Sequence, residues 1–160
     1  MRIDERIQAM LIIILVVYGM LVAAPILLGK RVVEPFSELG VLGPNMKLGE
    51  YPRNVETGKS VNLYLYIGNY EGGPRYYRIY AKLGDQFTNV SDTEAYPGEI
   101  LFQYDRVLLD ETNHTAPFKL ALSEPGVNKR LVFELHKYQD NEFKYFGLWT
   151  QIWMNVTDTQ

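Results

Sequence analysis

The residues closest to a known reactive motif are Gly58, Lys59 and Ser60, the final letters of the phosphate-binding loop of many nucleotide hydrolases. Such a loop needs a glycine five positions before Gly58 and a helix directly after it, because backbone N–H groups and a helix N-terminus bind the phosphates. Arg53 stands at the required glycine position, and residues 61–67 alternate as a strand does. We therefore interpret Gly58-Lys59 as a turn that leads into a strand, and a nucleotide site is excluded.

Acidic pairs are the next candidates for chemistry: Asp92/Glu94, Asp110/Glu111 and Asp140/Glu142. Each pair lies in a polar, turn-like stretch, where solvated charge is expected. A glycosidase requires two facing carboxyl groups about 5–9.5 Å apart, and sequence spacing alone does not establish this geometry. We therefore interpret these pairs as charged turns.

Histidine and cysteine set limits on metal and nucleophile chemistry. The chain has no cysteine and two histidines, which excludes disulfides, thiolate sites and multi-histidine metal centres. His114 falls in a loop-like stretch, and His136 shares a strand face with Glu134, where we expect it to be exposed. We assign no catalytic, cofactor-binding or metal-binding residue and no cofactor, and we expect that the protein is not an enzyme.

Length and charge bound the class of protein. A chain of 160 residues allows one domain of ordinary size with an appendage. The net charge of −3, without a basic stripe, argues against a nucleic-acid partner, whose phosphates require clustered Lys and Arg.

Residues 9–28 form an uncharged apolar run, AMLIIILVVYGMLVAAPILL. Twenty helical residues span roughly 30 Å, the thickness of the hydrocarbon core of a bilayer. A cleavable signal peptide is the alternative, but its apolar stretch is normally about 7–15 residues long, and here Pro25 follows the small pair Ala23-Ala24. The run therefore predicts a retained, single-pass transmembrane helix in contact with membrane lipid. Gly19 and Ala23 form a small-xxx-small pair, a candidate for helix packing.

Glycosylation sequons indicate the side of the membrane. Two basic residues precede the apolar run and two follow it, so charge does not decide the orientation. Three Asn-X-Ser/Thr sequons lie beyond the run, at Asn89, Asn113 and Asn155. The alternative is that Asn, Ser and Thr simply concentrate in turns and strand ends. The sequons favour an extracytoplasmic domain at the cell membrane with a cytoplasmic N-terminus, and they make these residues candidate glycosylation sites.

After residue 35 the chain reads as short strands separated by Gly, Pro, Asn and Asp. The candidate strands cover residues 61–67, 76–83, 99–109, 116–122, 129–138 and 143–156. No segment in this part has a convincing 3.6-residue period. About seven strands at this spacing predict a mainly β chain with an immunoglobulin-like β-sandwich. We therefore divide the chain into a cytoplasmic tip and anchor, residues 1–31, and an extracytoplasmic sandwich, residues 32–160.

Tyrosines on two of these strands form a candidate interaction surface. Tyr64 and Tyr66 share one strand face, and Tyr76 and Tyr80 share another with Arg78. If the two strands are neighbours, these residues make one aromatic and cationic patch that suits a protein partner or sugar rings. If the connection crosses between sheets, the two groups lie apart. The structural alternative is that Tyr is a good strand former that covers a sheet surface.

The middle of the chain resembles a known family. Residues 36–72 contain an LGP…G…YP lead-in and a strand that ends in Gly-Asn-Tyr-Glu-Gly, and a later Glu-Pro-Gly turn occupies residues 124–126. With the final strand LWTQIWMNV, these features resemble an archaeal membrane-protein family known as domain of unknown function 1616. Members often carry several membrane helices before this domain, whereas this chain has one apolar run. The resemblance implies the fold and the membrane address, but no activity.

Three functions are compatible with this pattern. The leading hypothesis is a non-enzymatic, membrane-anchored binding or accessory domain, a protein-interaction subunit of an envelope or membrane complex. The alternative is a glycan- or cell-wall-binding module that uses the tyrosines. The third is an enzyme with an unrecognised carboxylate pair.

Overall fold

The structure is a computed structural model that describes residues 4–27 and 34–158. The chain divides into two compact units, Met1–Glu34 and Pro35–Gln160. The boundary that we predicted between residues 31 and 32 lies outside the described residues.

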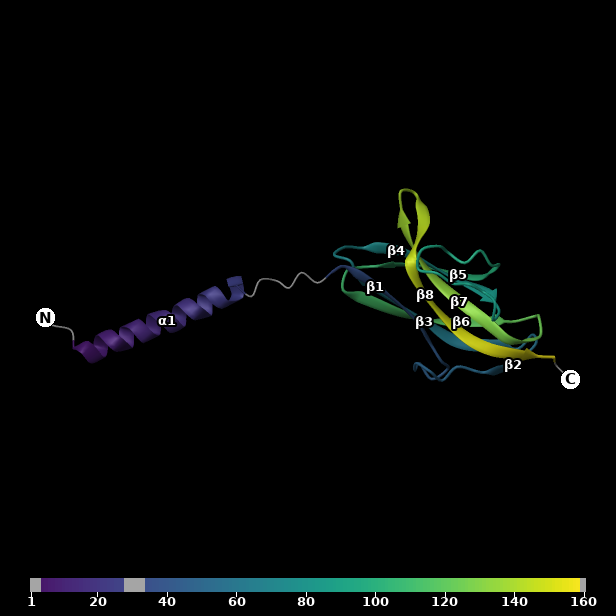
Figure 1. The fold of residues 1–160 in the computed structure, drawn as a ribbon, viewed down its shortest axis with the longest axis horizontal. Helices are drawn as coiled ribbons and strands as arrows, with labels where there is room; N and C mark the ends of the chain where they lie inside the picture. Colours follow the sequence, from purple (N-terminus) through teal and green to yellow (C-terminus); the bar gives the residue numbers. More distant parts are fainter. Residues whose placement is uncertain (1–3, 28–33, 159–160) are drawn as a thin grey trace. The chain divides into compact units, whose positions relative to one another are not determined.

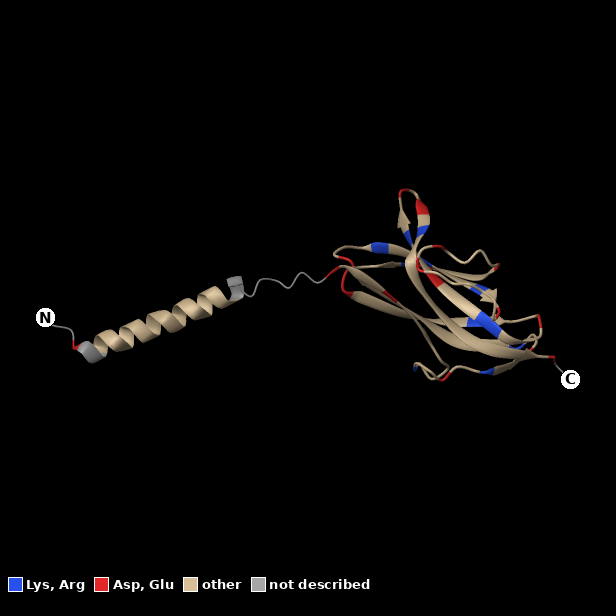
Figure 2. Cartoon of the chain, viewed as in Figure 1, with Lys and Arg blue, Asp and Glu red and all other residues tan. Residues whose placement is uncertain are grey.

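The first unit contains one helix, α1, Glu5–Leu27. Apolar residues cover every side of it, whereas a helix on the surface of a soluble domain has a polar face. Its segment Ile7–Ala24 is long and apolar enough to cross a membrane, and in Figure 2 this segment has neither the blue of Lys and Arg nor the red of Asp and Glu. Gly19 and Ala23 lie one turn apart on α1, and a helix partner for them stays a prediction.

The second unit is a sandwich of two sheets (Figure 1). Its described residues form the strands β1 Phe36–Leu42, β2 Asn54–Glu56, β3 Ser60–Tyr70, β4 Arg75–Gly84, β5 Ile100–Leu108, β6 Thr112–Ala121, β7 Gly126–Gln139 and β8 Glu142–Thr157. The smaller sheet has the order β1-β3-β6, and the larger has the order β2-β8-β7-β4-β5. The predicted fold class is confirmed, although the predicted strand list missed β1 and β2, which lie in the Gly- and Pro-rich lead-in.

One core fills the space between the two sheets, because alternate residues of each strand point inward. The largest fully buried apolar side chains are Phe118, Leu63, Leu65 and Ile67 from the smaller sheet and Tyr77, Phe133, Ile79, Leu131 and Leu135 from the larger one. The Phe118 ring packs edge-on against Phe102 and Phe133, with centroid distances of 4.7 and 5.5 Å. These contacts join the sheets through apolar surface, without disulfides.

The Gly58-Lys59 segment is a turn, as the sequence predicts. Gly58 has a φ of 76°, a left-handed conformation that glycine adopts without steric cost. Its N–H donates to the carbonyl of Leu122 at 2.9 Å, and the Lys59 ammonium pairs with Glu56 at 2.6 Å. Strand β3 begins at Ser60, so Gly58-Lys59 leads into a strand and not into a helix.

Candidate interaction surface

The structure separates the predicted tyrosine surface into two parts. The short β3–β4 turn crosses from one sheet to the other, so β3 and β4 are not neighbours. Tyr64 and Tyr66 therefore lie on the outer face of the smaller sheet, whereas Tyr76, Arg78 and Tyr80 lie on the outer face of the larger one. Of the two arrangements that the sequence left open, the structure has the one in which the two groups lie apart, because strand adjacency depends on the topology and not on the spacing.

An ion pair fixes Arg78 on the outer face of the larger sheet. The guanidinium binds the carboxylate of Asp105 on the neighbouring strand through two nitrogens, at 2.8 and 2.6 Å. Its central carbon also lies 3.9 Å from the centroid of the Phe143 ring. The hydrogen bond from Arg78 lowers the pKa of Asp105, so the pair stays charged at neutral pH. Arg78 is therefore held in one orientation at the surface.

Aromatic rings surround this arginine. Tyr76 lies 4.9 Å from Phe143 and 5.7 Å from Tyr138, measured between ring centroids, and Tyr138 lies 5.2 Å from Phe143. Tyr76 is 37% exposed, Tyr138 is 45% exposed, and Val107, the partner of Tyr76 on β5, is 57% exposed. We call these five residues the aromatic patch: Tyr76, Arg78, Val107, Tyr138 and Phe143.

The β7–β8 hairpin supplies two members of the patch that sequence reasoning missed. Its two-residue turn, Asp140 and Asn141, has φ values of 52° and 68°, which tight hairpins favour. This turn makes Tyr138 and Phe143 direct cross-strand partners. The sequence feature that predicts this hairpin is the polar stretch QDN, residues 139–141, between two segments of alternating polarity. A register shift after Leu135 separates the hairpin end from the rest of the sheet, and the hairpin projects from the domain (Figure 1).

A buried charge cluster borders the patch on the same sheet face. Glu134 is 0% exposed and His136 is 7% exposed, so the expectation that His136 is exposed is wrong. Lys82 donates to the Glu134 carboxylate at 2.7 Å, and the N–H of Tyr96 donates to its other oxygen at 2.5 Å. Burial alone would raise the pKa of Glu134, but hydrogen bonds from His136, Lys82 and Tyr96 outweigh it and lower the pKa.

The cluster is buried because residues 85–99 lie over this part of the sheet; we call them the covering segment. Tyr145 of β8 donates to the carbonyl of Ser91 at 2.6 Å, and Arg130 of β7 donates to the carbonyl of Thr88 at 2.5 Å. The Tyr80 ring packs edge-on against His136 with a centroid distance of 4.8 Å. Tyr80 therefore lies at the border between the covered half of the face and the open aromatic patch.

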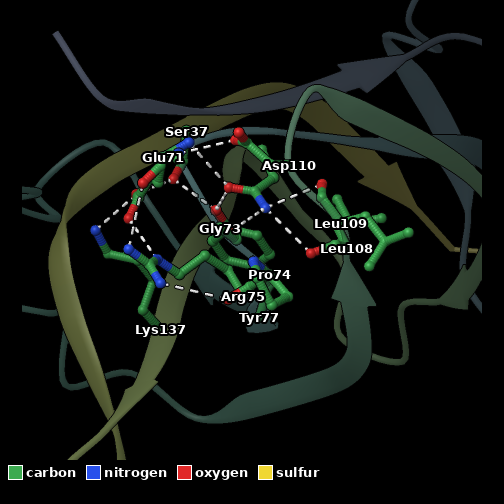
Figure 3. Close-up of polar contacts among 12 residues, drawn as sticks. Ser37, Glu71, Gly73, Pro74, Arg75, Tyr77, Leu108, Leu109, Asp110 and Lys137 are labelled. Carbon is green, nitrogen blue, oxygen red and sulfur yellow. Dashed lines mark hydrogen bonds and ion pairs between the residues drawn. The ribbon is translucent and has the colours of Figure 1, made fainter.

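A second polar cluster, the Glu71 network, ties the β3–β4 turn to both sheets (Figure 3). Glu71 accepts hydrogen bonds from Lys137 at 2.8 Å, from Arg75 at 2.9 Å and from the Ser37 hydroxyl. Ser37 also shares a hydrogen bond of 2.8 Å with the Tyr77 hydroxyl. Burial would raise the pKa of Glu71, but these hydrogen bonds lower it to about 2. A carboxylate with so low a pKa is a weak base at neutral pH, so the network is poorly suited to general-base catalysis.

Asn69 completes the Glu71 network from inside the domain. Its amide nitrogen donates to the carbonyls of Gly73, Leu108 and Leu109 at 2.9, 3.1 and 3.0 Å. Its oxygen accepts hydrogen bonds from the Tyr77 hydroxyl and from the N–H of Glu71. The Gly-Asn-Tyr-Glu-Gly motif therefore has a structural role, because its Asn and Glu hold the turn that crosses between the sheets.

The remaining candidates are not members of the aromatic patch, although Asp140 and Glu142 lie in the hairpin that supplies Tyr138 and Phe143. His114 is in β6, not in a loop, and its ring is parallel to that of Tyr104 with 6.2 Å between centroids. Asp110 accepts a hydrogen bond from the N–H of Gly72 at 2.8 Å, and Asp140 and Glu142 both pair with Lys144. Among the described residues, no group of three His, Asp or Glu side chains is placed to hold a metal ion.

These features define an immunoglobulin-like β-sandwich domain preceded by one long apolar helix. The sequence profile described as domain of unknown function 1616 matches residues 31–147. The chain therefore belongs to that family, which confirms the resemblance noted in the sequence. No curated protein matches the chain.

Two solved structures are similar to the fold. The CARDB domain of a Pyrococcus furiosus protein, solved in complex with di-metal ions, is 9% identical with a TM-score of 0.50, and the match covers 81% of this chain and 94% of that chain. A sporulation control protein from Bacillus subtilis is 13% identical with a TM-score of 0.50, covering 76% of this chain and 49% of that chain. This chain thus spans about half of the latter protein. At these identities the similarity shows the fold alone.

The Glu71 network generates a prediction about acid stability. The pKa of Glu71 is about 2 in the folded protein against 4.5 ordinarily, so Glu71 stabilises the fold above about pH 4.5 and this contribution is lost as the pH falls toward 2. Glu71→Gln should lower the free energy of unfolding at pH 7 by roughly 2–3 kcal/mol and flatten its decrease between pH 5 and 2. Denaturant unfolding at a series of pH values measures both effects.

Glu124→Gln is the matched control, since the Glu124 side chain is 75% exposed and lies 3.6 Å from its Lys partner. This variant should unfold within about 0.5 kcal/mol of the wild type. If the free energy of unfolding of Glu71→Gln decreases as steeply between pH 5 and 2 as that of the wild type, the proposed role of the network is contradicted.

Proposed function

We propose that the chain is a non-enzymatic, membrane-anchored accessory domain that binds a protein partner outside the cytoplasm through the aromatic patch. The observation that carries this proposal is the exposure of Tyr76 and Tyr138 around the fixed Arg78–Asp105 pair. Tyr and Arg dominate the binding free energy of many protein interfaces, since they bury large areas and also donate hydrogen bonds. Val107 adds an exposed aliphatic side chain beside them.

The patch is organised before any partner binds. Asp105 and the Phe143 ring hold the Arg78 guanidinium, and Phe143 also contacts the ring of Tyr76. Side chains that are already fixed lose little rotamer freedom on association, so more of the contact free energy contributes to affinity. This rigidity supports a specific protein interface rather than a solvated sheet surface.

A glycan-binding module is the alternative, and the ring geometry at the patch favours a protein instead. The ring planes of Tyr76, Tyr138 and Phe143 are inclined to one another by 47° to 71°. Such edge-to-face packing covers part of each ring, whereas a sugar stacks on a flat, open aromatic face. The separation of Tyr64 and Tyr66 from this face also removes the larger aromatic platform.

Helix α1 and the sequons support the proposed membrane location and orientation of the chain. Helix α1 supports a lipid anchor, because its length and composition suit a bilayer. The three sequons lie beyond it and support an extracytoplasmic domain with Met1 in the cytoplasm.

A photo-crosslinking amino acid at position 138 should join the protein to a single partner of defined mass in native membranes. Tyr76→Ala should then reduce the yield at least roughly fivefold, because an interface tyrosine contributes more than about 1 kcal/mol to binding. Position 64 is the matched control, since Tyr64 is a half-buried tyrosine on the outer face of the other sheet. Equal products at both positions, or none at 138, would contradict the proposal, and a glycan product would favour the alternative.

Thiol labelling tests the extracytoplasmic location of the domain. No native thiol competes with an introduced one, because the chain has no cysteine. Val127 is 77% exposed, so Val127→Cys should react with a membrane-impermeant maleimide in intact cells. Asp4→Cys, before α1, should react only after lysis. The reverse pattern would place the domain in the cytoplasm and overturn this part of the proposal.

A further inference from the structure

The three sequons differ in whether their atoms are available for modification. Asn155 is committed to the fold: its amide nitrogen donates to the Asn54 side chain at 3.1 Å, and its oxygen accepts from the N–H of Asn128 at 2.9 Å. These bonds tie β2 and the start of β7 to β8. A bulky glycan on this nitrogen would displace Asn54, so the structure disfavours modification of Asn155.

Asn89 is exposed, but the hydroxyl of its sequon is engaged. Ser91 shares a hydrogen bond of 2.6 Å with the Thr93 hydroxyl and accepts one of 3.0 Å from the N–H of Thr93. The carbonyl of Ser91 also accepts the hydroxyl of Tyr145. The Asn89 sequon is therefore part of the covering segment, where its hydroxyl already has partners.

Asn113 is placed differently. It is exposed near the start of β6, which forms an edge of the smaller sheet. Thr115 follows two residues later, so its hydroxyl lies on the same face of the strand as the Asn113 amide. Directly across from Asn113 is Gly68 of β3, and the Glu38 and Tyr70 side chains occupy the space over this glycine.

The surface beside Asn113 has the groups that a sugar can contact. The Glu38 carboxylate lies over Gly68 and accepts the hydroxyl of Tyr66 at 2.6 Å. Next to it, the rings of Phe36 and Tyr70 stack at 4.8 Å with an angle of 18° between their planes. These nearly parallel rings and the carboxylate offer an apolar face and a hydrogen-bond acceptor, unlike the inclined rings of the aromatic patch.

We propose that Asn113 carries an N-linked glycan that covers the outer face of the smaller sheet. The Asn113 amide nitrogen forms a bond to the anomeric carbon of a lipid-phosphate-linked oligosaccharide, the bond from that carbon to the phosphate oxygen breaks, and the lipid phosphate leaves as the nitrogen loses one proton. The inference rests on the proposed extracytoplasmic address. It also names the face that a protein partner does not use, because the glycan blocks the smaller sheet and leaves the aromatic patch on the larger sheet open.

Tryptic digestion separates the three sequons, because cleavage after Lys and Arg places them in residues 83–106, 107–119 and 145–160. Mass spectrometry of the full chain from native membranes should find a glycan mass on the 107–119 peptide and an unmodified 145–160 peptide. Asn113→Gln should remove that mass, and so should Thr115→Val, which keeps the amide and the β-branched shape. Asn89→Gln is the control that should leave the mass on the 107–119 peptide unchanged.

An unmodified 107–119 peptide overturns the inference, as does a glycan confined to residues 83–106 or 145–160. The thiol-labelling pattern separates this failure from that of the proposed function. If Val127→Cys is labelled in intact cells and Asn113 is unmodified, the assignment of the glycan is wrong, but the extracytoplasmic location of the domain is supported. If Val127→Cys is not labelled in intact cells, the proposed extracytoplasmic location is wrong, and the assignment of a glycan to Asn113 is then wrong as well.

Discussion

The connection between β3 and β4 is the constraint on which both outer faces of the sandwich depend. It passes from the smaller sheet to the larger within residues 71–74. Asn69 and Glu71 hold this crossing, since between them they bond to groups from both sheets. Tyr66 and Tyr76 are therefore close in sequence yet belong to the outer faces of different sheets. The domain presents two unlike surfaces as a direct result.

The outer face of the larger sheet is divided again by buried charge. Lys82 and Glu134 pair beneath the covering segment, and separating either from its partner would leave an uncompensated charge at a cost of several kcal/mol. Gly147 lets the covering segment approach β8 closely. It has a φ of 87°, and a Cβ at this position would collide with the carbonyl of Asp92. The part of the face beside the hairpin stays open, and it carries the aromatic patch.

Local sequence patterns predicted the secondary-structure elements well. They predicted less well the properties that depend on distant parts of the chain, such as strand neighbours and burial. The period-two alternation of residues 61–67 and 76–83 depends only on which side chains face the core, so the strands and the sandwich could be predicted. The neighbours of each strand depend on long-range pairing, and for this reason the sequence left open whether the tyrosines form one surface or two. His136 was misjudged for a similar reason, since a distant segment buries a residue whose own strand face looks polar.

Hydrogen exchange measures the central claim most directly, namely that the hairpin side of the larger sheet is the face at which the domain is bound. The account predicts that backbone amides of residues 136–145 exchange at least roughly tenfold more slowly in native membranes than in the purified protein. Amides of β1 and β3 should exchange at the same rate in both samples. Identical exchange of residues 136–145 in the two samples, or protection confined to β1 and β3, would contradict the account.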